Sequence, residues 1–395
     1  MEDYSKPVVL TFINNYLPGY KAGGIPRSMI NTVENMSLYV DFWIVTRDRD
    51  LGETEPYKNI LKKKWQRVGS AMVYYLSPDE SSFQNIRDLI AKTQHDILYL
   101  NSFFDSFTIK ALLSRKFGRN KLNPVIVAPR GEFASAALKI KYLRKFSYIS
   151  FVRIIGLYNN VKWHASSKFE ETDIKQRMKI KSCLIHTALD LPTKFVPDNS
   201  VPSILHDSNG FNGLKIIFLS RIARVKNLDI ALKILSKVTA NVVFDIYGPL
   251  EDPKYWTECQ ELINILPHNI MVHYRGIVTP DQIIPVFGCY DLFLLPTGGE
   301  NYGHVIAESL TSGTPVLISD KTPWKNLQSN NFGWDIPLDK INLYIEIIEN
   351  YAKMSLDQRS EKRSSIKAAI EKYLLDPIVL EANIQLFLDR AFPGK

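Results

Sequence analysis

Two glutamates, Glu300 and Glu308, stand eight residues apart in the stretch LLPTGGENYGHVIAESLTSGTPVL, which runs from Leu294 to Leu317. The pattern predicts a strand, a glycine-rich turn, a helix that begins near Tyr302, and a second strand. Such a turn lets backbone N–H groups approach a ligand closely, and the helix start attracts an anion through its free N–H groups and its dipole. With Glu300 on the loop and Glu308 two turns inside the helix, both carboxylates can border one pocket. A capped helix start followed by a solvated acid fits the same spacing.

A second candidate site is the stretch SRIARVKN at 220–227, which follows a predicted strand over 215–219. Its cations Arg221 and Lys226 leave the strand end five residues apart, so both can converge on one anionic group. A bidentate guanidinium fork together with an ammonium point charge suits a diphosphate. Two surface cations in a loop are the alternative.

The stretch PGYKAGGIPR at 18–27 places Gly23 and Gly24 ahead of a helix that Pro26 begins, which is another anion-binding geometry. This is not GxGxxG, and neither that motif nor GxxxxGK[ST] occurs in the sequence. The dinucleotide and P-loop interpretations therefore lose their main support. A lone glycine pair is weak evidence by itself.

The scaffold expected for these loops is a pair of parallel sheets, because short β-branched or aromatic runs alternate with amphipathic stretches along the chain. Strands are predicted at 8–13, 42–46, 72–76, 97–100, 125–128, 161–164, 184–186, 215–219, 242–247, 271–274, 292–295 and 315–318. Helices are predicted at 27–36, 83–93, 107–117, 134–158, 228–237, 256–266, 280–287, 305–312, 338–354, 356–373 and 377–392.

The alternation breaks over 191–213, where prolines and glycines lie among polar residues, and this segment is the predicted linker. We expect an N-terminal Rossmann-like domain over 1–190, a C-terminal one over 214–376, and a last helix at 377–395 that packs back on the first domain. Two open α/β sheets present their ligand crevices at the carboxyl ends of the strands. A cleft between the domains is then the default substrate site.

Composition excludes several protein classes. The 395 residues are 45% hydrophobic and 23% charged, which is typical of a globular protein and not of a disordered or collagen-like one. No apolar run reaches the ~20 residues of a membrane span, and acids stand where a signal peptide would carry cations. Cys183, Cys259 and Cys289 form no CxxC pair, which predicts buried, reduced thiols without zinc or a disulfide framework. The expected location is the cytoplasm.

The net charge of +8 is unevenly spread: residues 1–190 carry +11, and the remainder carries −3. Within 115–163 there are eleven basic residues and one acid, which predicts an anionic partner for this region. On the helix predicted over 134–158, Lys141, Arg144 and Lys145 share a face, Lys139 lies nearby, and large apolar residues follow. Such a helix can lie on an anionic membrane surface. A helix packed on the core with a solvated basic face is the alternative.

Taken together, these stretches resemble the retaining glycosyltransferase family four of the GT-B fold. The E-x7-E pattern from Glu300 to Glu308, with NYGH inside it and SGTPV after it, is typical of that family. SRIARVKN after a strand, the later TPW and GW motifs, PGYKAGGIPRS, and APRGEFASAALKIKYLRK at 128–145 match as well. The resemblance covers nearly the whole chain and is most specific in its second half. It implies two Rossmann-like domains that face each other across a cleft.

The resemblance also implies a role for each site residue in a sugar transfer from a nucleotide diphosphate donor. Arg221 and Lys226 would neutralise the donor diphosphate, Glu308 would hold the ribose hydroxyls, and Glu300 would meet the transferred sugar. The backbone of Asn301, Tyr302 and Gly303 would assist Glu300, and the N–H groups of His304 and Val305 would reach the phosphates. The resemblance places the base near 276–278, beside Ile277 and Val278, and closes Gly23 and Gly24 against the donor phosphate from the other domain.

Catalysis by this family implies no protein nucleophile, because the leaving phosphate takes the acceptor proton. Relatives that build bacterial surface polysaccharides on lipid-linked acceptors use an N-domain membrane patch, which implies a lipid-linked glycan acceptor. Many relatives also place a catalytic histidine roughly where this chain has Arg130, so Arg130 is a candidate to bind phosphate or acceptor. His164 is a second candidate for that cleft. A plain loop arginine and a satisfied core histidine are the alternatives.

No cofactor or metal is expected, because Arg221, Lys226 and helix N-termini meet the donor charge. The sole DxD motif, Asp48 to Asp50, lies far in sequence from the donor motifs. Two other functions compete. A nucleic-acid-binding protein would explain the basic region, but no recognised motif supports it and the second half is acidic. A GT-B sugar-nucleotide epimerase would share the fold and would need no acceptor.

Overall fold

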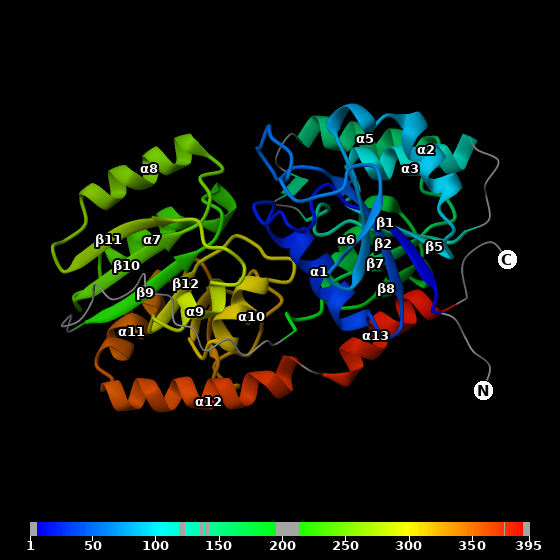
Figure 1. Cartoon of the computed structure of the whole chain (residues 1–395). Helices are drawn as coiled ribbons and strands as arrows, with labels where there is room; N and C mark the ends of the chain where they lie inside the picture. Colours follow the sequence, from blue (N-terminus) through cyan, green and yellow to red (C-terminus); the bar gives the residue numbers. More distant parts are fainter. Residues whose placement is uncertain are drawn as a thin grey trace. The chain divides into compact units, whose positions relative to one another are not determined.

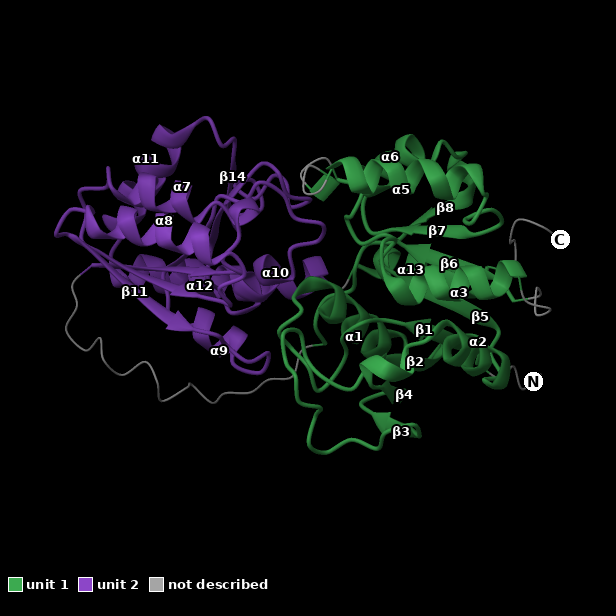
Figure 2. Ribbon diagram, turned by 90° about the horizontal axis from the view of Figure 1, so that it is seen from above, with its two compact units in different colours: residues 1–194, 376–395 green, residues 195–375 purple. Residues whose placement is uncertain are grey.

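The computed structural model describes residues 6–117, 123–134, 137–138, 142–194, 213–374 and 376–389. The chain divides into two compact units (Figure 2). Unit 1 comprises residues 1–194 and 376–395, and unit 2 comprises residues 195–375. Each unit is an α/β body with its own sheet, as the ribbon in Figure 1 shows. The predicted linker at 191–213 lies outside the described residues over 195–212.

The sheet of unit 1 has the strand order β3-β4-β2-β1-β5-β6-β7-β8. Its strands are β1 (Val8–Phe12), β2 (Asp41–Arg47), β3 (Trp65–Val68), β4 (Ala71–Leu76), β5 (Ile97–Asn101), β6 (Val125–Ala128), β7 (Lys162–Ala165) and β8 (Ile185–Thr187). β3 pairs antiparallel with β4 at the edge, and the other pairs are parallel. Alternate residues of the strands enter two separate apolar clusters, so both faces of this sheet are buried.

Helices cover both faces of that sheet. They are α1 (Gly24–Met36), α2 (Phe83–Lys92), α3 (Ser106–Phe117), α5 (Tyr142–Ile154), α6 (Lys168–Met178) and α13 (Pro377–Leu388). Apolar side chains of α1 and α13 share one cluster, and those of α2, α3, α5 and α6 share the other. α13 belongs to unit 1 although it follows unit 2 in sequence. Its Phe387 packs edge-on against Phe42 and Tyr99, with ring centroids 5.5 and 5.3 Å away.

Unit 2 is built on a parallel sheet with the order β11-β10-β9-β12-β13-β14. Its strands are β9 (Leu214–Leu219), β10 (Val242–Tyr247), β11 (Ile270–Gly276), β12 (Leu292–Leu295), β13 (Val316–Ser319) and β14 (Gly333–Ile336). Its helices are α7 (Leu228–Leu235), α8 (Pro253–Asn264), α9 (Ile283–Phe287), α10 (His304–Thr311), α11 (Ile341–Ala352) and α12 (Leu356–Leu374). The short strand β12 is wholly buried, as expected for a central parallel strand.

The predicted α/β class with two doubly wound parallel sheets is confirmed, but three elements were missed. β3 (WQRV) and β14 (GWDI) have four residues each and mix polar with apolar residues, so they lack the unbroken apolar run that marked the other short strands. α6 is too polar for an apolar stripe, although Ser167 caps it by accepting a hydrogen bond from the N–H of Glu170. The S-x-x-E signature of a helix start was therefore present in the sequence.

The helix predicted over 134–158 is shorter than expected. α5 ends at Ile154, and Gly156 adopts a left-handed φ of 63° that an α-helix cannot continue through. Cys259 is buried and Cys289 half-buried, but Cys183 is exposed, which contradicts its predicted burial. The exposure follows from its place in a short 3-10 turn (Ser182–Leu184) ahead of the edge strand β8. Among the described residues, no helix has the length and apolar character needed to cross a membrane.

Candidate active site

The carboxyl edge of the unit 2 sheet is packed so closely that one of its turns requires glycine. Gly248, directly after β10, has a φ of 136°, and a Cβ there would meet the carbonyl oxygen of Ser220 at 1.9 Å. Its N–H donates to the carbonyl of Gly276 at the end of β11 (2.8 Å), and the N–H of Ser220 donates to Tyr247 (3.0 Å). The ends of β9, β10 and β11 therefore meet in one row, as parallel strands require.

Two loops from this edge are joined by their backbones. The backbone N–H of Gly298 donates to the carbonyl of Val225 (2.6 Å), and the side-chain amide of Asn227 donates to the carbonyl of Pro296 (2.8 Å). Asn227 has a left-handed φ of 55°, a conformation that asparagine tolerates better than most residues. These bonds place the loop after β9 beside the loop after β12, although the two are about seventy residues apart in sequence.

An ion pair joins the side chains that these two loops carry. The Lys226 ammonium lies 2.5 Å from a carboxylate oxygen of Glu300, and each side chain is 11% exposed. A pair so little exposed is weakly screened by solvent, so each charge depends on the other. The structure thus brings together two of the residues that the sequence analysis predicted to be catalytic.

Arg221, the third of these residues, has another carboxylate as its neighbour. Its guanidinium is 39% exposed and forms an ion pair with Glu251, from the loop between β10 and α8. Glu251 was not predicted, since a single acid in a loop carries no sequence signal. Arg221 and Lys226 therefore face different carboxylates in this structure, and their convergence on one diphosphate stays a prediction.

The loop before α10 is held by a tryptophan from another segment. The Trp324 indole N–H donates to the carbonyl of Tyr302 (2.7 Å), and Trp324 is 5% exposed. Gly303, next in the loop, has a φ of 82°, and a Cβ there would come within 2.9 Å of Ile306. Glycine and Trp324 thus set the direction in which the chain enters α10. The sequence marked Trp324 through the TPW motif but gave it no role.

α10 begins at His304, one residue before the predicted range of 305–312 and two after Tyr302, because the left-handed residue at Gly303 is its N-cap. Glu308 is therefore one helical turn from the start, where two turns were predicted, and it is buried with 4% exposure. Asn301 and Val305 are half-buried. The N–H groups of Ile306 and Ala307 donate to the carbonyl of Gly303, so the cap residue itself closes the first turn of the helix.

The predicted base-binding segment follows β11. Ile277 is 46% exposed, and Val278 packs against the core of unit 2. In unit 1, Gly23 has a φ of 76° and is the N-cap of α1, which starts at Gly24 and so three residues earlier than predicted. Nothing lies within 4 Å of a Cβ built on Gly24, so the backbone there is open to approach.

Two predicted site residues of unit 1 are core residues instead. The Arg130 guanidinium lies 2.6 Å from a carboxylate oxygen of Asp190, and both side chains are 2% exposed. It also donates to the side-chain oxygens of Asn101 (3.0 Å) and Tyr99 (2.8 Å). Each of its three nitrogens thus donates to a partner inside unit 1. The prediction that Arg130 binds phosphate or acceptor is corrected, because its charge is neutralised inside unit 1.

His164 belongs to the same buried network, which favours the alternative of a satisfied core histidine over a place in a cleft. Its two ring nitrogens lie 2.7 Å from the Tyr99 hydroxyl and 2.9 Å from the carbonyl oxygen of Ala188. Burial, helped by the nearby positive charge of Arg130, lowers the pKa of His164 to about 3. The imidazole is therefore neutral at physiological pH and acts as a structural hydrogen-bonding group.

The basic face predicted for the helix over 134–158 is different in the structure. Lys139 and Lys141 lie outside the described residues. Lys145 turns inward: its ammonium donates to the carbonyl of Ala137 (2.8 Å) and lies 5.2 Å from the ring centroid of Phe104. Arg144 is exposed, as predicted.

Part of the chain matches known proteins in sequence. Residues 205–377 match the family model described as glycosyl transferases group 1. An uncharacterized glycosyltransferase of Sulfolobus islandicus rod-shaped virus 1 is 21% identical over 284 residues, which are 69% of this chain and 82% of that protein. The GtfA subunit of a peptide N-acetylglucosaminyltransferase from Streptococcus pneumoniae is 24% identical over 42% of this chain and 33% of its own length.

Solved structures show the same fold across almost the whole chain. Anabaena HepE, in complex with UDP and glucose, has a TM-score of 0.69 at 14% identity and covers 96% of this chain and 98% of its own. WaaG, a glycosyltransferase involved in lipopolysaccharide biosynthesis, has a TM-score of 0.66 at 13% identity, with 96% and 99% covered.

The class of protein is thus defined: two Rossmann-like units of the GT-B fold. The protein is a glycosyltransferase enzyme, and its group 1 match lies in unit 2 except for the last two matched residues. The non-enzymatic alternative, nucleic-acid binding, is thereby set aside.

Proposed function

We propose that this enzyme transfers a sugar, with retention of anomeric configuration, from a nucleotide diphosphate donor to a lipid-linked glycan in surface polysaccharide or glycoconjugate synthesis. The observation that carries the proposal is the Lys226–Glu300 pair at the carboxyl edge of the unit 2 sheet, beside the start of α10. A cation, a carboxylate and a helix N-terminus together can bind a diphosphate and hold the hydroxyls of the attached sugar. The UDP and UDP-glucose complexes of the HepE structures support a nucleotide-sugar donor.

In this proposal the donor diphosphate displaces Glu300 as the partner of Lys226. The bond from the sugar C1 to the diphosphate oxygen breaks while the acceptor oxygen bonds to C1, and the acceptor proton passes to the leaving phosphate oxygen. Lys226, Arg221 and the α10 start stabilise the developing negative charge. Glu300 then orients the sugar and Glu308 the ribose. No metal is required, since these groups meet the charge.

A panel of uridine, guanosine and adenosine diphosphate sugars, each labelled in the sugar, tests this proposal. The cognate donor should raise the melting temperature, since a ligand at about a hundred times its Kd stabilises the native state by ~2.7 kcal/mol. The label should move only when a glycan acceptor is added, and excess EDTA should leave the rate unchanged. Conversion of the donor without an acceptor would instead identify an epimerase. Loss of transfer in EDTA, restored by Mg²⁺ or Mn²⁺, would refute the metal-free mechanism.

The proposed acceptor is lipid-linked, because α5 presents an apolar surface outward. Leu143 is 79% exposed, Phe146 55%, Phe151 58% and Ile154 84%. At about 100° per residue, Leu143, Phe151 and Ile154 lie within about 80° of one another around α5, and Phe146 lies on the other flank of Leu143. Val152, on the side opposite Leu143, is buried. Exposed apolar residues of this size gathered on one helix mark an interaction surface.

The charges beside this outward face favour an anionic membrane over a protein partner. Arg144 and the exposed Arg153 flank the apolar residues, and residues 115–163 carry a large excess of cations. Each cation near an anionic leaflet contributes ~1 kcal/mol, and the attraction fades within a Debye length of ~8 Å. The proposal places the enzyme peripherally on the cytoplasmic face of the cell membrane.

Changing Leu143 and Ile154 together to glutamine should release the protein from vesicles of phosphatidylcholine and phosphatidylglycerol, measured by sedimentation at low and high salt. The expected cause is the loss of apolar side chains that enter the headgroup region. The matched control is the double change of Leu356 and Ile265 to glutamine in unit 2, since these side chains are 78% and 75% exposed. Wild-type protein that stays in the supernatant at both salt concentrations would remove the membrane from the proposal.

A further inference from the structure

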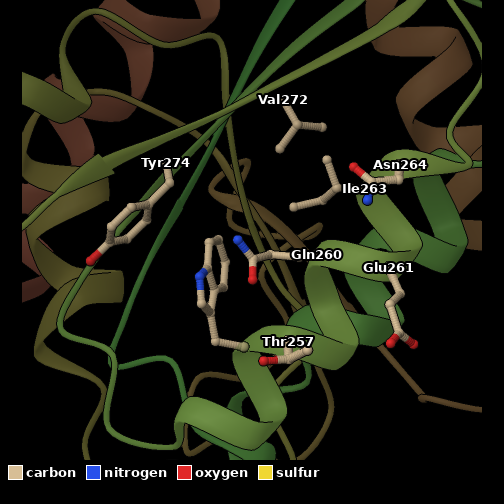
Figure 3. Close-up of a pocket in the computed structure, with 8 residues that line it drawn as sticks. Thr257, Gln260, Glu261, Ile263, Asn264, Val272 and Tyr274 are labelled. Atoms are coloured by element: carbon tan, nitrogen blue, oxygen red, sulfur yellow. The ribbon is translucent and has the colours of Figure 1, made fainter.

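Unit 2 carries an open pocket that shares no residue with the candidate active site. It has a volume of 460 Å³ and lies between α8 and the edge strand β11 (Figure 3). A volume of this size falls within the ~300–1,000 Å³ range of small-molecule sites. Ile263 and Val272 supply the apolar part of its lining. The pocket exists because β11 is the last strand of the sheet and α8 alone lines this side of it.

Two aromatic rings form one end of the pocket. The ring centroids of Trp256 and Tyr274 are 5.0 Å apart with an interplanar angle of 48°. Trp256 is half-buried, and Tyr274 is 40% exposed. The Tyr274 hydroxyl donates to the carbonyl of Gly248 (2.8 Å), which fixes the ring on the edge of the sheet. Both rings therefore keep apolar surface available on rigid elements, and the C–H face of a pyranose ring is a natural partner for such a surface.

Four polar side chains line the pocket beside these rings. Thr257, Gln260, Glu261 and Asn264 recur at intervals of three, one and three residues, so they lie along one side of α8 (Figure 3). Among the described residues, the side chains of Gln260, Glu261 and Asn264 take part in no intramolecular hydrogen bond or ion pair. Two amides and a carboxylate offer both donors and acceptors, which is the complement that sugar hydroxyls need.

The charge of the lining distinguishes between possible ligands. Glu261 is the one charged side chain among the described residues that line the pocket, and none of these residues is a lysine or an arginine. A nucleotide or another phosphate ester would meet an acid without a compensating cation, which disfavours it. A neutral saccharide meets the half-buried ring of Trp256, the exposed ring of Tyr274 and unpaired amides instead. The chemistry of the pocket is therefore that of a neutral glycan site.

We propose that the pocket between α8 and β11 is a second saccharide-binding site, which holds a neutral segment of the glycan chain that the enzyme extends. That the bound glycan is also the acceptor that the enzyme extends rests on the proposed function. Its binding to the pocket rests on Trp256, Tyr274 and the polar side of α8 alone. Such a site would raise the affinity for long acceptors by tethering them, without touching the reacting atoms.

Binding is measured on the full-length protein without donor, by saturation-transfer NMR and tryptophan fluorescence. The probes are neutral hexasaccharides of glucose, galactose, mannose and N-acetylglucosamine. At least one should bind, and Trp256→Ala and Tyr274→Ala should each weaken that binding at least tenfold. Tyr39→Ala, at a tyrosine of unit 1 that is 37% exposed, is the matched control and should bind as wild type does.

Three results would overturn the proposal. They are no binding of any probe, binding that both aromatic variants leave unchanged, and displacement of the saccharide by UDP. A dimer in sedimentation that Trp256→Ala dissociates would instead assign the pocket to a second copy of the chain. Because no donor is present, the result does not depend on turnover. A protein that binds saccharides here but transfers no sugar would leave this site standing and refute the proposed function.

Discussion

Replacing Lys226 with alanine should lower the kcat/KM of sugar transfer by a factor of about 10²–10³, the usual cost of removing a preorganised group that stabilises transition-state charge. The structure adds a second reason. Lys226 is the ion-pair partner of Glu300, and both side chains are nearly buried, so the change also leaves an unpaired carboxylate where the donor diphosphate should bind. Arg221→Ala and Glu308→Ala should impair transfer in the same assay.

The matched control for Lys226 is its near neighbour Arg224. Its guanidinium is 58% exposed and pairs with Glu258 on α8, away from Glu300. Arg224→Ala should therefore keep wild-type turnover. Circular dichroism and urea unfolding should show that each variant is folded. Near-wild-type kcat/KM in a folded Lys226→Ala protein would contradict the assignment of Lys226 to the diphosphate.

Replacing Arg130 with methionine should lower the free energy of unfolding by about 3–5 kcal/mol, the cost of breaking a buried ion pair on one side. Asp190 would keep its charge with 2% of its side chain exposed and would lose its partner. The Ser28 hydroxyl, which donates to the other Asp190 oxygen (2.6 Å), cannot replace a cation. Urea unfolding measures the effect.

The control for this change is Arg87→Met in the same unit, where a surface arginine beside Asp88 is 46% exposed. The free energy of unfolding of the Arg87→Met protein should change by less than ~0.5 kcal/mol, as is usual for surface substitutions. The experiment also separates the two interpretations of Arg130. A ligand-binding arginine would show a raised KM with an unchanged free energy of unfolding, and that result would assign Arg130 to the phosphate or the acceptor.

Much of the fold was predictable because its signals are local. Buried parallel strands such as Val125–Ala128 and Leu292–Leu295 are short apolar runs, and both were predicted with the bounds that the structure shows. β3 and α6 were missed because their local patterns are weak: β3 is a four-residue edge strand, and α6 has few apolar residues. Where α10 starts depended on the left-handed conformation at Gly303, which no periodicity reports.

The outward side of α5 shows a different limit. Large apolar residues occur almost all round this helix, so the sequence does not reveal which of them the core covers. The cations were the clearest pattern in this part of the sequence, and the helix was therefore predicted to present a basic face. The structure instead buries Ile149 and Val152, turns Lys145 inward and leaves Leu143 and Ile154 exposed.

By itself, the sequence determined the fold class, the strand ends that carry the loops, and the set of charged residues in unit 2 from which a donor site can be built. Each of these follows from patterns within about twenty residues. The tertiary structure alone decided which charges meet. Lys226 pairs with Glu300 because β9 lies beside β12 in the sheet of unit 2. Arg130 pairs with Asp190 because they follow β6 and β8, which lie in the same half of the unit 1 sheet. Strand order sets these long-range contacts, so a loop arginine that binds a ligand and one that is buried in the core look the same in sequence.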